Sequence, residues 1–115
     1  MVRLESLKKS SQFKKVLKEK KIHTDYFSIF ATKNFFLPKH KANLLISFVM
    51  KKKIGNAVKR NRIKRKLKAI VHKLLKKKGA INKDNTYIVF GKSKAYEEKQ
   101  SALLHEMTKC FKKIK

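Results

Sequence analysis

The chain has 115 residues, of which 33 are Lys or Arg and seven are Asp or Glu, so its formal net charge is +26. The length fits one small domain with a modest core. The hydrophobic residues, 42% of the chain with eight Phe, are numerous enough to form a core, which argues against an intrinsically disordered chain. A folded domain this basic is typical of nucleic-acid binding, whereas a surface that charge merely keeps soluble usually mixes Lys with Glu.

The first half of the chain predicts a helix followed by strands. Ser10 or Ser11 can cap the helix, because a side-chain hydroxyl satisfies free amide groups at a helix start. After the basic residues 20–21 the chain becomes extended, and side chains alternate between two faces over residues 26–32. One face holds Phe27, Ile29 and Ala31, and the other holds Tyr26, Ser28, Phe30 and Thr32. A loop around Pro38 then leads to a second strand, which is apolar enough on both faces to be central in a sheet and is expected at residues 43–50.

The second half predicts a long helix, a short strand and a final helix. Gly55 ends the preceding pattern, and the long helix is expected from residue 56 or 57 to Lys78, with Gly79 as its C-terminal cap. A strand follows at residues 86–90 and a helix at residues 96–113. The order helix, strands, helix, strand, helix predicts an α+β fold in one small domain, an α/β sandwich with a strand–helix–strand crossover around the long helix.

The segment 51–68 is the most informative part of the sequence, because ten of its residues are Lys or Arg and none is acidic. At 100° per residue, one side of the helix is apolar and is formed by Ile63, Leu67, Ile70, Val71, Leu74 and Leu75. The opposite side carries Asn61, Arg65, Lys68 and His72. Like charges at this density repel one another, and a polyphosphate backbone would relieve the repulsion.

The first turn of this helix differs from the rest. Lys59 and Arg60 occupy the angular sector that becomes apolar after Ile63. We therefore expect the helix start to project beyond the core, with its amide groups and residues 51–53 available to anions.

Aromatic residues offer a second kind of RNA contact. Phe13 on the first helix, with Tyr26 or Phe30 on the first strand, could line a shallow surface on which unstacked bases lie. Taken singly, each of these rings is more often a core residue. No paired carboxylates, nucleophile–base pair or phosphate-binding loop is visible, so neither protein-based catalysis nor a protein metal site is expected.

Cys110 is the single cysteine, which excludes an intrachain disulfide and a cysteine zinc site. The longest apolar run, at residues 44–50, is too short to span a bilayer, and the N-terminus lacks the apolar core of a signal peptide. We expect a reduced, cytoplasmic location. Membrane-surface binding is less favoured, because the strongest helix is committed to a core.

A resemblance to a known family rests on the run Lys52-Lys53-Ile54-Gly55-Asn56-Ala57-Val58, followed by Arg60-Asn61-Arg62 and Lys64-Arg65. This run closely resembles the RNR signature of the bacterial ribonuclease P protein subunit. The segments 10–16, 26–30 and 87–92 are also similar to that family, so the resemblance spans nearly the whole chain. Departures from the family pattern are Lys51 in place of the usual Ser, Ala69 in place of an acid and Lys92 where Arg is common.

The resemblance implies a ribonuclease P holoenzyme, an endoribonuclease in which a large catalytic RNA, with Mg²⁺ as cofactor, removes the 5′ leader of precursor tRNA. The protein alone would be inactive. The catalytic RNA would be contacted by Lys59, Arg60, Asn61, Arg62, Lys64, Arg65 and Lys68. The leader would lie in a cleft between the sheet and the first helix, near Phe13, Tyr26, Phe30, Lys52 and Lys53. The implied crossover is left-handed, although the physical preference is for a right-handed one.

Two other functional classes are alternatives on the sequence alone. A ribosomal or general RNA-binding protein would bind structured RNA without preference for a leader. A DNA-binding protein could place the basic helix in the major groove, but apart from Asn61 the helix lacks the exposed amide side chains of a base-reading surface, and no dimer signal appears.

Overall fold

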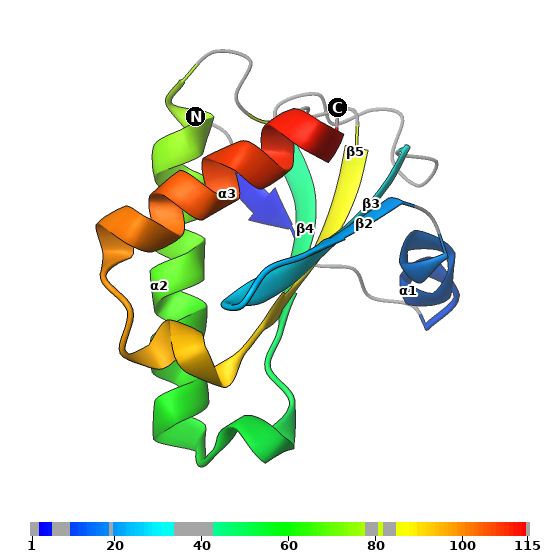
Figure 1. Ribbon diagram of the computed structural model, residues 1–115. Helices are drawn as coiled ribbons and strands as arrows, with labels where there is room; N and C mark the ends of the chain where they lie inside the picture. Colours follow the sequence, from blue (N-terminus) through cyan, green and yellow to red (C-terminus); the bar gives the residue numbers. More distant parts are fainter. Residues whose placement is uncertain are drawn as a thin grey trace.

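The computed structural model describes residues 3–5, 10–18, 20–33, 43–77, 81 and 85–114. The strands are β1 (Arg3–Glu5), β2 (Lys20–His23), β3 (Phe27–Lys33), β4 (Asn43–Val49) and β5 (Asn85–Gly91). The α-helices are α1 (Ser10–Leu17), α2 (Ala57–Leu75) and α3 (Gln100–Ile114), and two short 3₁₀ helices are η1 (Lys52–Ile54) and η2 (Ser93–Tyr96). Figure 1 shows these elements around one twisted sheet.

The sheet is mixed, with the strand order β1-β4-β5-β3-β2. β4 is parallel to both β1 and β5, whereas β3 is antiparallel to β5 and β2. The helices α2 and α3 lie on one face of the sheet and α1 lies on the other (Figure 1). The predicted α/β sandwich is therefore confirmed, and β5, whose residues are all buried or half-buried, lies in the middle of the sheet with helices over both faces.

β4, α2 and β5 form the strand–helix–strand crossover. The two strands are parallel neighbours, and α2 returns between them on the face that α3 also covers. Figure 1 shows this crossover to be left-handed, as the family resemblance implied. Parallel crossovers are right-handed in about 98% of cases, so no general rule would have predicted this hand.

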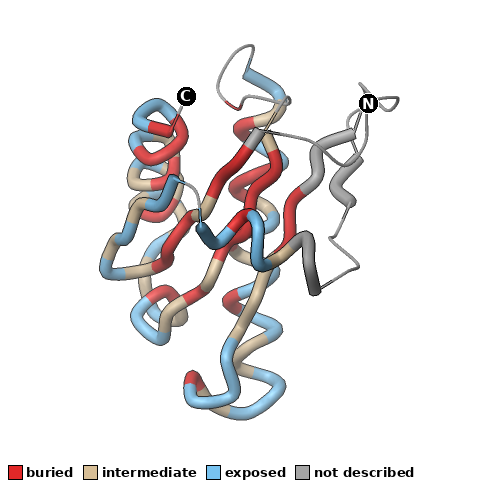
Figure 2. The backbone as a smooth tube through the Cα atoms, turned by 90° about the vertical axis from the view of Figure 1, so that its right-hand side faces the viewer, coloured by how far each residue is buried: buried red, intermediate tan, exposed pale blue. Residues whose placement is uncertain are grey.

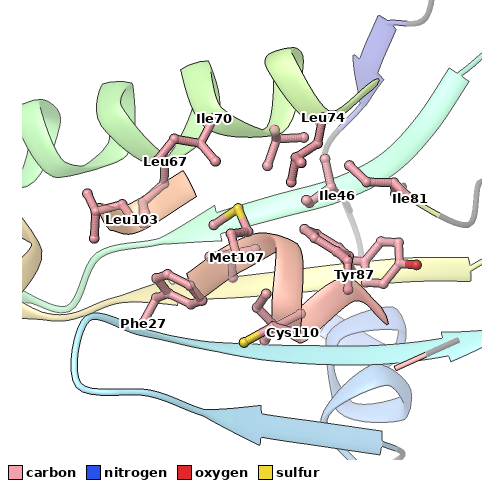
Figure 3. Close-up of a cluster of buried hydrophobic side chains, with 14 of the residues drawn as sticks. Phe27, Ile46, Leu67, Ile70, Leu74, Ile81, Tyr87, Leu103, Met107 and Cys110 are labelled. Atoms are coloured by element: carbon pink, nitrogen blue, oxygen red, sulfur yellow. The ribbon is translucent and has the colours of Figure 1, made fainter. Parts of the chain in front are cut away.

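The main core lies between the sheet and the two helices on its α2 face. Five of the six residues on the predicted apolar side of α2 are fully buried there, at Ile63, Leu67, Ile70, Val71 and Leu74, and the sixth, Leu75, is half-buried against the same core. Figure 3 shows Leu67, Ile70 and Leu74 of this side in the same cluster as Ile46 of β4, Tyr87 of β5 and Met107 of α3. Across this core the rings of Tyr87 and Phe111 pack edge to face at 5.0 Å. Burying a large aliphatic side chain contributes about 1.5–3 kcal/mol. Burial of this side therefore stabilises α2 against the repulsion between its like-charged side chains.

A smaller core lies on the opposite face, beneath α1. Val16 and Ile88 are fully buried, and four half-buried side chains pack against them: Phe13, Phe30, Val49 and Phe90. The alternation predicted for the first strand is confirmed over β3, because Phe27, Ile29 and Ala31 face the main core while Phe30 faces α1. It is wrong for Tyr26, which was predicted on the Phe30 face but packs against the main core.

Several predicted boundaries are wrong. α2 ends at Leu75 with Lys76 as its C-cap, three residues before the predicted end, and both Gly79 and the Pro38 loop lie outside the described residues. α3 begins at Gln100, because residues 93–96 form η2 instead of a first helical turn. The strands β1 and β2 were not predicted; β2 is an edge strand with mostly exposed side chains, so it has little hydrophobic signal.

Candidate RNA-binding surfaces

The start of α2 is a tight turn that the sequence specifies locally. Asn56 is the N-cap, and its Oδ1 accepts a hydrogen bond from the Lys59 amide at 2.9 Å. Gly55 has a φ of +152°, and a Cβ there would lie 2.9 Å from Cδ of Lys59. Only glycine adopts this conformation readily. Figure 1 shows that this end of the molecule extends past the sheet, as predicted. It is largely exposed in Figure 2, and Val58 in the first turn is 61% exposed.

The outer side of α2 is cationic and open to solvent. Exposed side chains there are Asn61, Arg62, Lys64, Arg65 and Lys68. The other two residues predicted to contact the catalytic RNA, Lys59 and Arg60, are half-buried. Within the described part of the chain, the Nε atom of Arg60 is buried without a hydrogen-bond partner. Since α2 contains no acidic residue, nothing on the helix neutralises this side.

Three basic residues of α2 contact the segment around η2. Lys59 Nζ donates to Ser93 Oγ at 2.9 Å, and Arg62 Nη1 donates to the Tyr96 hydroxyl at 3.3 Å. Lys66 Nζ donates to three main-chain oxygens, those of residues 95, 96 and 98, at 3.3, 2.6 and 3.0 Å. These contacts join residues about 30 positions apart, so they fix the loop after β5 to the cationic helix.

A cleft of about 450 Å³ lies on the other face of the sheet, between the end of α1, the strands and the segment before α2. Its lining comprises Leu17, His23, Ser28, Phe30, Lys51, Lys53, Ile54, Phe90, Gly91, Lys92 and Ser93. The rings of Phe30 and Phe90 meet edge to face at 5.4 Å. Lys51 Nζ lies 5.6 Å from the centre of the Phe90 ring. Aromatic rings with lysines beside them suit a single-stranded nucleic acid, whose bases stack while its phosphates attract cations.

The predicted leader residues are distributed unequally around this cleft. Phe30 and Lys53 line it, and Phe13 packs in the same small core without reaching the lining. Lys52 is exposed in η1 but is not part of the lining. The sequence offered Tyr26 or Phe30 beside Phe13, and the structure places Phe30 there, because Tyr26 packs against the main core on the α2 side.

The lining also contains aromatic and basic residues that were not predicted to contact the leader, among them His23, Lys51, Phe90 and Lys92. His23 Nδ1 lies 2.6 Å from Ser28 Oγ, and its ring meets Phe30 edge to face at 5.8 Å. Lys92 Nζ donates to the Thr24 carbonyl at 2.6 Å, which fixes a cation at the end of the cleft. Alternation could have placed Phe90 on a sheet face, but its position beside Phe30 depends on the β3–β5 register.

Tyr26 belongs to a second polar cluster. A hydrogen bond from its hydroxyl to the Glu98 carboxylate raises the pKa of Tyr26. The pKa of Glu98 is lowered, first by the Lys99 amide, which donates to Oε1 at 2.9 Å, and then by the Tyr26 hydroxyl. Near neutral pH the pair is therefore a neutral phenol and an ionised carboxylate. Elsewhere, burial raises the pKa of the Cys110 thiol, which agrees with the predicted core role.

Among the helices that the structure describes, none combines the length and apolar character needed to cross a membrane.

Comparison with known proteins agrees with this architecture. The family model described as Ribonuclease P matches residues 1–115. The ribonuclease P protein component of Listeria innocua is 32% identical over 104 residues, which cover 86% of this chain and 82% of the relative. That of Mycoplasma mycoides is 28% identical over 109 residues, covering 95% and 94%. The solved ribonuclease P protein of Thermotoga maritima has the same fold, with a TM-score of 0.75, 24% identity and coverage of 96% and 98%.

Proposed function

The chain belongs to the ribonuclease P protein family, which acts in the processing of tRNA 5′ ends, and on this premise we propose how its two surfaces divide the work. The outer side of α2 binds the catalytic RNA, and the cleft beside α1 holds the 5′ leader of precursor tRNA. The observation that carries this proposal is that residues 51–54 join the two surfaces: Lys51 and Lys53 line the cleft, and α2 begins three residues after Ile54. One protein can therefore contact both RNAs close to the junction that is cut.

The outer side of α2 supports the first half of the proposal. Its exposed arginines and lysines, chiefly Arg62, Lys64, Arg65 and Lys68, meet no acidic residue on the helix. Arginine suits phosphate because its planar fork can donate two parallel hydrogen bonds. Each phosphate that is neutralised releases counterions, so about five contacts would lower affinity by a few hundredfold between 50 and 200 mM salt.

The cleft supports the second half. Phe30 and Phe90, whose rings pack edge to face, line the cleft together with Lys51, Lys53 and Lys92. Stacking accepts any base, because every base has a π-face. The cleft therefore suits leaders of varied sequence, with contacts that follow the strand and do not read its bases.

The cleavage itself is assigned to the catalytic RNA. Mg²⁺ held by that RNA would supply an activated water for hydrolysis, while the protein binds and positions both RNAs. A protein of net charge +26 offsets phosphate repulsion between them, so the holoenzyme should need less Mg²⁺ than the RNA alone.

Reconstitution tests the proposal. The purified protein should leave precursor tRNA intact, and it should restore cleavage by a bacterial ribonuclease P RNA at a Mg²⁺ concentration where that RNA alone is weak. Arg62→Ala combined with Arg65→Ala should weaken assembly about 10–100-fold, whereas the matched pair Lys76→Ala and Lys77→Ala, at the far end of α2, should have a much smaller effect. Absence of stimulation by the wild-type protein would refute the proposed function.

A further inference from the structure

A second cavity, the η2 pocket, lies on the α2 face of the sheet beside the start of α2. Its volume is about 440 Å³, and its lining comprises Tyr26, Lys59, Ser93, Lys94, Tyr96, Glu97 and Glu98. This volume is within the range of small-ligand sites, about 300–1,000 Å³. Ser93 lines both this pocket and the cleft, but neither tyrosine of the η2 pocket lines the cleft.

The charges of the η2 pocket are balanced, in contrast to the rest of the chain. The lining holds two lysines, Lys59 and Lys94, and two glutamates, Glu97 and Glu98, in a chain whose net charge is +26. The carboxylates oppose a phosphate group, and the two ammonium groups oppose a metal cation. A polar group without net charge fits this lining best.

The tyrosines give the pocket flat surfaces that are already held in place. The Tyr26 hydroxyl is bound to the Glu98 carboxylate. The Tyr96 hydroxyl accepts a hydrogen bond from Arg62, and Lys59 Nζ lies 5.3 Å from the centre of the Tyr96 ring. Rings that are fixed before binding lose little entropy on binding, and tyrosine rings are common stacking surfaces for unpaired bases.

The carboxylates specify which bases would bind. An ionised carboxylate only accepts hydrogen bonds, and Glu or Asp side chains recognise the exocyclic amino group of cytosine in this way. Adenine and guanine also carry an amino group, whereas uracil carries a carbonyl oxygen in that position. We propose that the η2 pocket binds an unpaired, amino-bearing nucleobase of the RNA that α2 contacts.

The pocket is tied to α2 in a way that makes this joint contact possible. Lys59 of α2 forms part of its wall, and Lys66 holds the main-chain oxygens of Tyr96 and Glu98. An RNA bound along the exposed side of α2 would therefore lie next to the pocket entrance. The inference rests on the proposed function for the identity of that RNA, but not for the chemistry of the pocket.

Cytidine and uridine are suitable probes, because neither carries a phosphate that the general positive field would attract. We expect cytidine to shift the ¹H–¹⁵N resonances of Tyr26 and residues 93–98 in the full-length protein, at a concentration at least about fivefold lower than uridine requires. Combining Glu97→Gln with Glu98→Gln should remove this preference. Equal affinities for the two nucleosides, or shifts confined to the cleft around Phe30 and Phe90, would overturn the proposal.

In the complex with ribonuclease P RNA, the same double variant separates two explanations that predict opposite changes in RNA affinity. Removing two negative charges should tighten RNA binding if the glutamates merely oppose phosphate, and the control Glu106→Gln on α3 should show that small gain. The pocket predicts instead that the double variant binds about 3–10-fold more weakly; tighter binding would overturn it. If wild-type protein fails to bind this RNA at all, the proposed function fails, and the nucleoside titration still decides the chemistry of the pocket.

Discussion

Lys66 lies among the side chains of α2 that we propose to bind RNA, but its own contacts predict a role in stability. Its Nζ atom donates to the main-chain oxygens of Ala95, Tyr96 and Glu98 at 3.3, 2.6 and 3.0 Å. Methionine keeps the unbranched stem of lysine without the ammonium group, so Lys66→Met leaves the three oxygens without this donor. One hydrogen bond from a charged group contributes about 1.5–3 kcal/mol. Because Lys66 is half-buried and water can reach part of the site, we expect a total loss of about 2–3 kcal/mol, less than the sum of three bonds.

Urea unfolding of the RNA-free protein measures this loss, which corresponds to a fall in melting temperature of about 8–12 °C for a domain of this size. Lys68→Met is the matched control, because it removes the same charge from an exposed position of the same helix. It should change stability by less than about 0.5 kcal/mol and yet weaken binding to ribonuclease P RNA. If the two variants unfold at the same urea concentration, the assignment of Lys66 to the η2 segment is refuted.

Three further changes test the cleft and its support. Phe30→Ala should reduce affinity for precursor tRNA by about 1–3 kcal/mol in the holoenzyme and leave affinity for mature tRNA unchanged; equal losses for both would contradict leader binding in the cleft. Gly91→Ala should destabilise the protein by about 1–3 kcal/mol in thermal unfolding, since the new Cβ would lie 2.9 Å from Cγ2 of Ile63, and an unchanged melting temperature would count against this packing. Lys51→Ser removes the cation beside the Phe90 ring. The slope of log affinity for the leader against log salt concentration should then fall by an amount equal to about one phosphate contact. An unchanged slope would show that Lys51 does not contact the leader.

The elements with strong periodicity could be predicted from the sequence, whereas contacts between distant elements could not. The buried side of α2 follows from a 3.6-residue repeat, and the faces of β3 follow from alternation. Tyr26 departs from that alternation because it precedes β3, in a turn where the Thr24 hydroxyl accepts hydrogen bonds from the amides of Tyr26 and Phe27. The contacts of Lys59 and Arg62 with residues 34 positions away depend on how the chain after β5 returns to α2. No local pattern specifies that return.

The hand of the crossover has a similar origin. Local twist favours right-handed connections, and nothing in the residues of β4, α2 or β5 opposes that preference visibly. The left-handed path places the start of α2, the end of β5 and η2 at one end of the molecule (Figure 1). As a result, the cleft and the η2 pocket lie on opposite faces of the sheet but share Ser93.

The charge of α2 links stability to binding. Like-charged neighbours at i,i+4 each disfavour the helix by about 0.2–0.5 kcal/mol, and the rows Arg60–Lys64 and Arg62–Lys66 lie on a helix without acids. Burial of its apolar side, about 1.5–3 kcal/mol for each large aliphatic residue, outweighs this repulsion, so α2 is formed before RNA arrives. In the proposed complex, a phosphate backbone along the exposed side would then remove repulsion that the core alone had offset. The free energy of RNA binding would therefore include relief of repulsion that is already present in the folded protein. Neutralising an exposed member of these rows that does not contact the η2 segment, such as Lys64, should stabilise the free protein while weakening its complex with RNA.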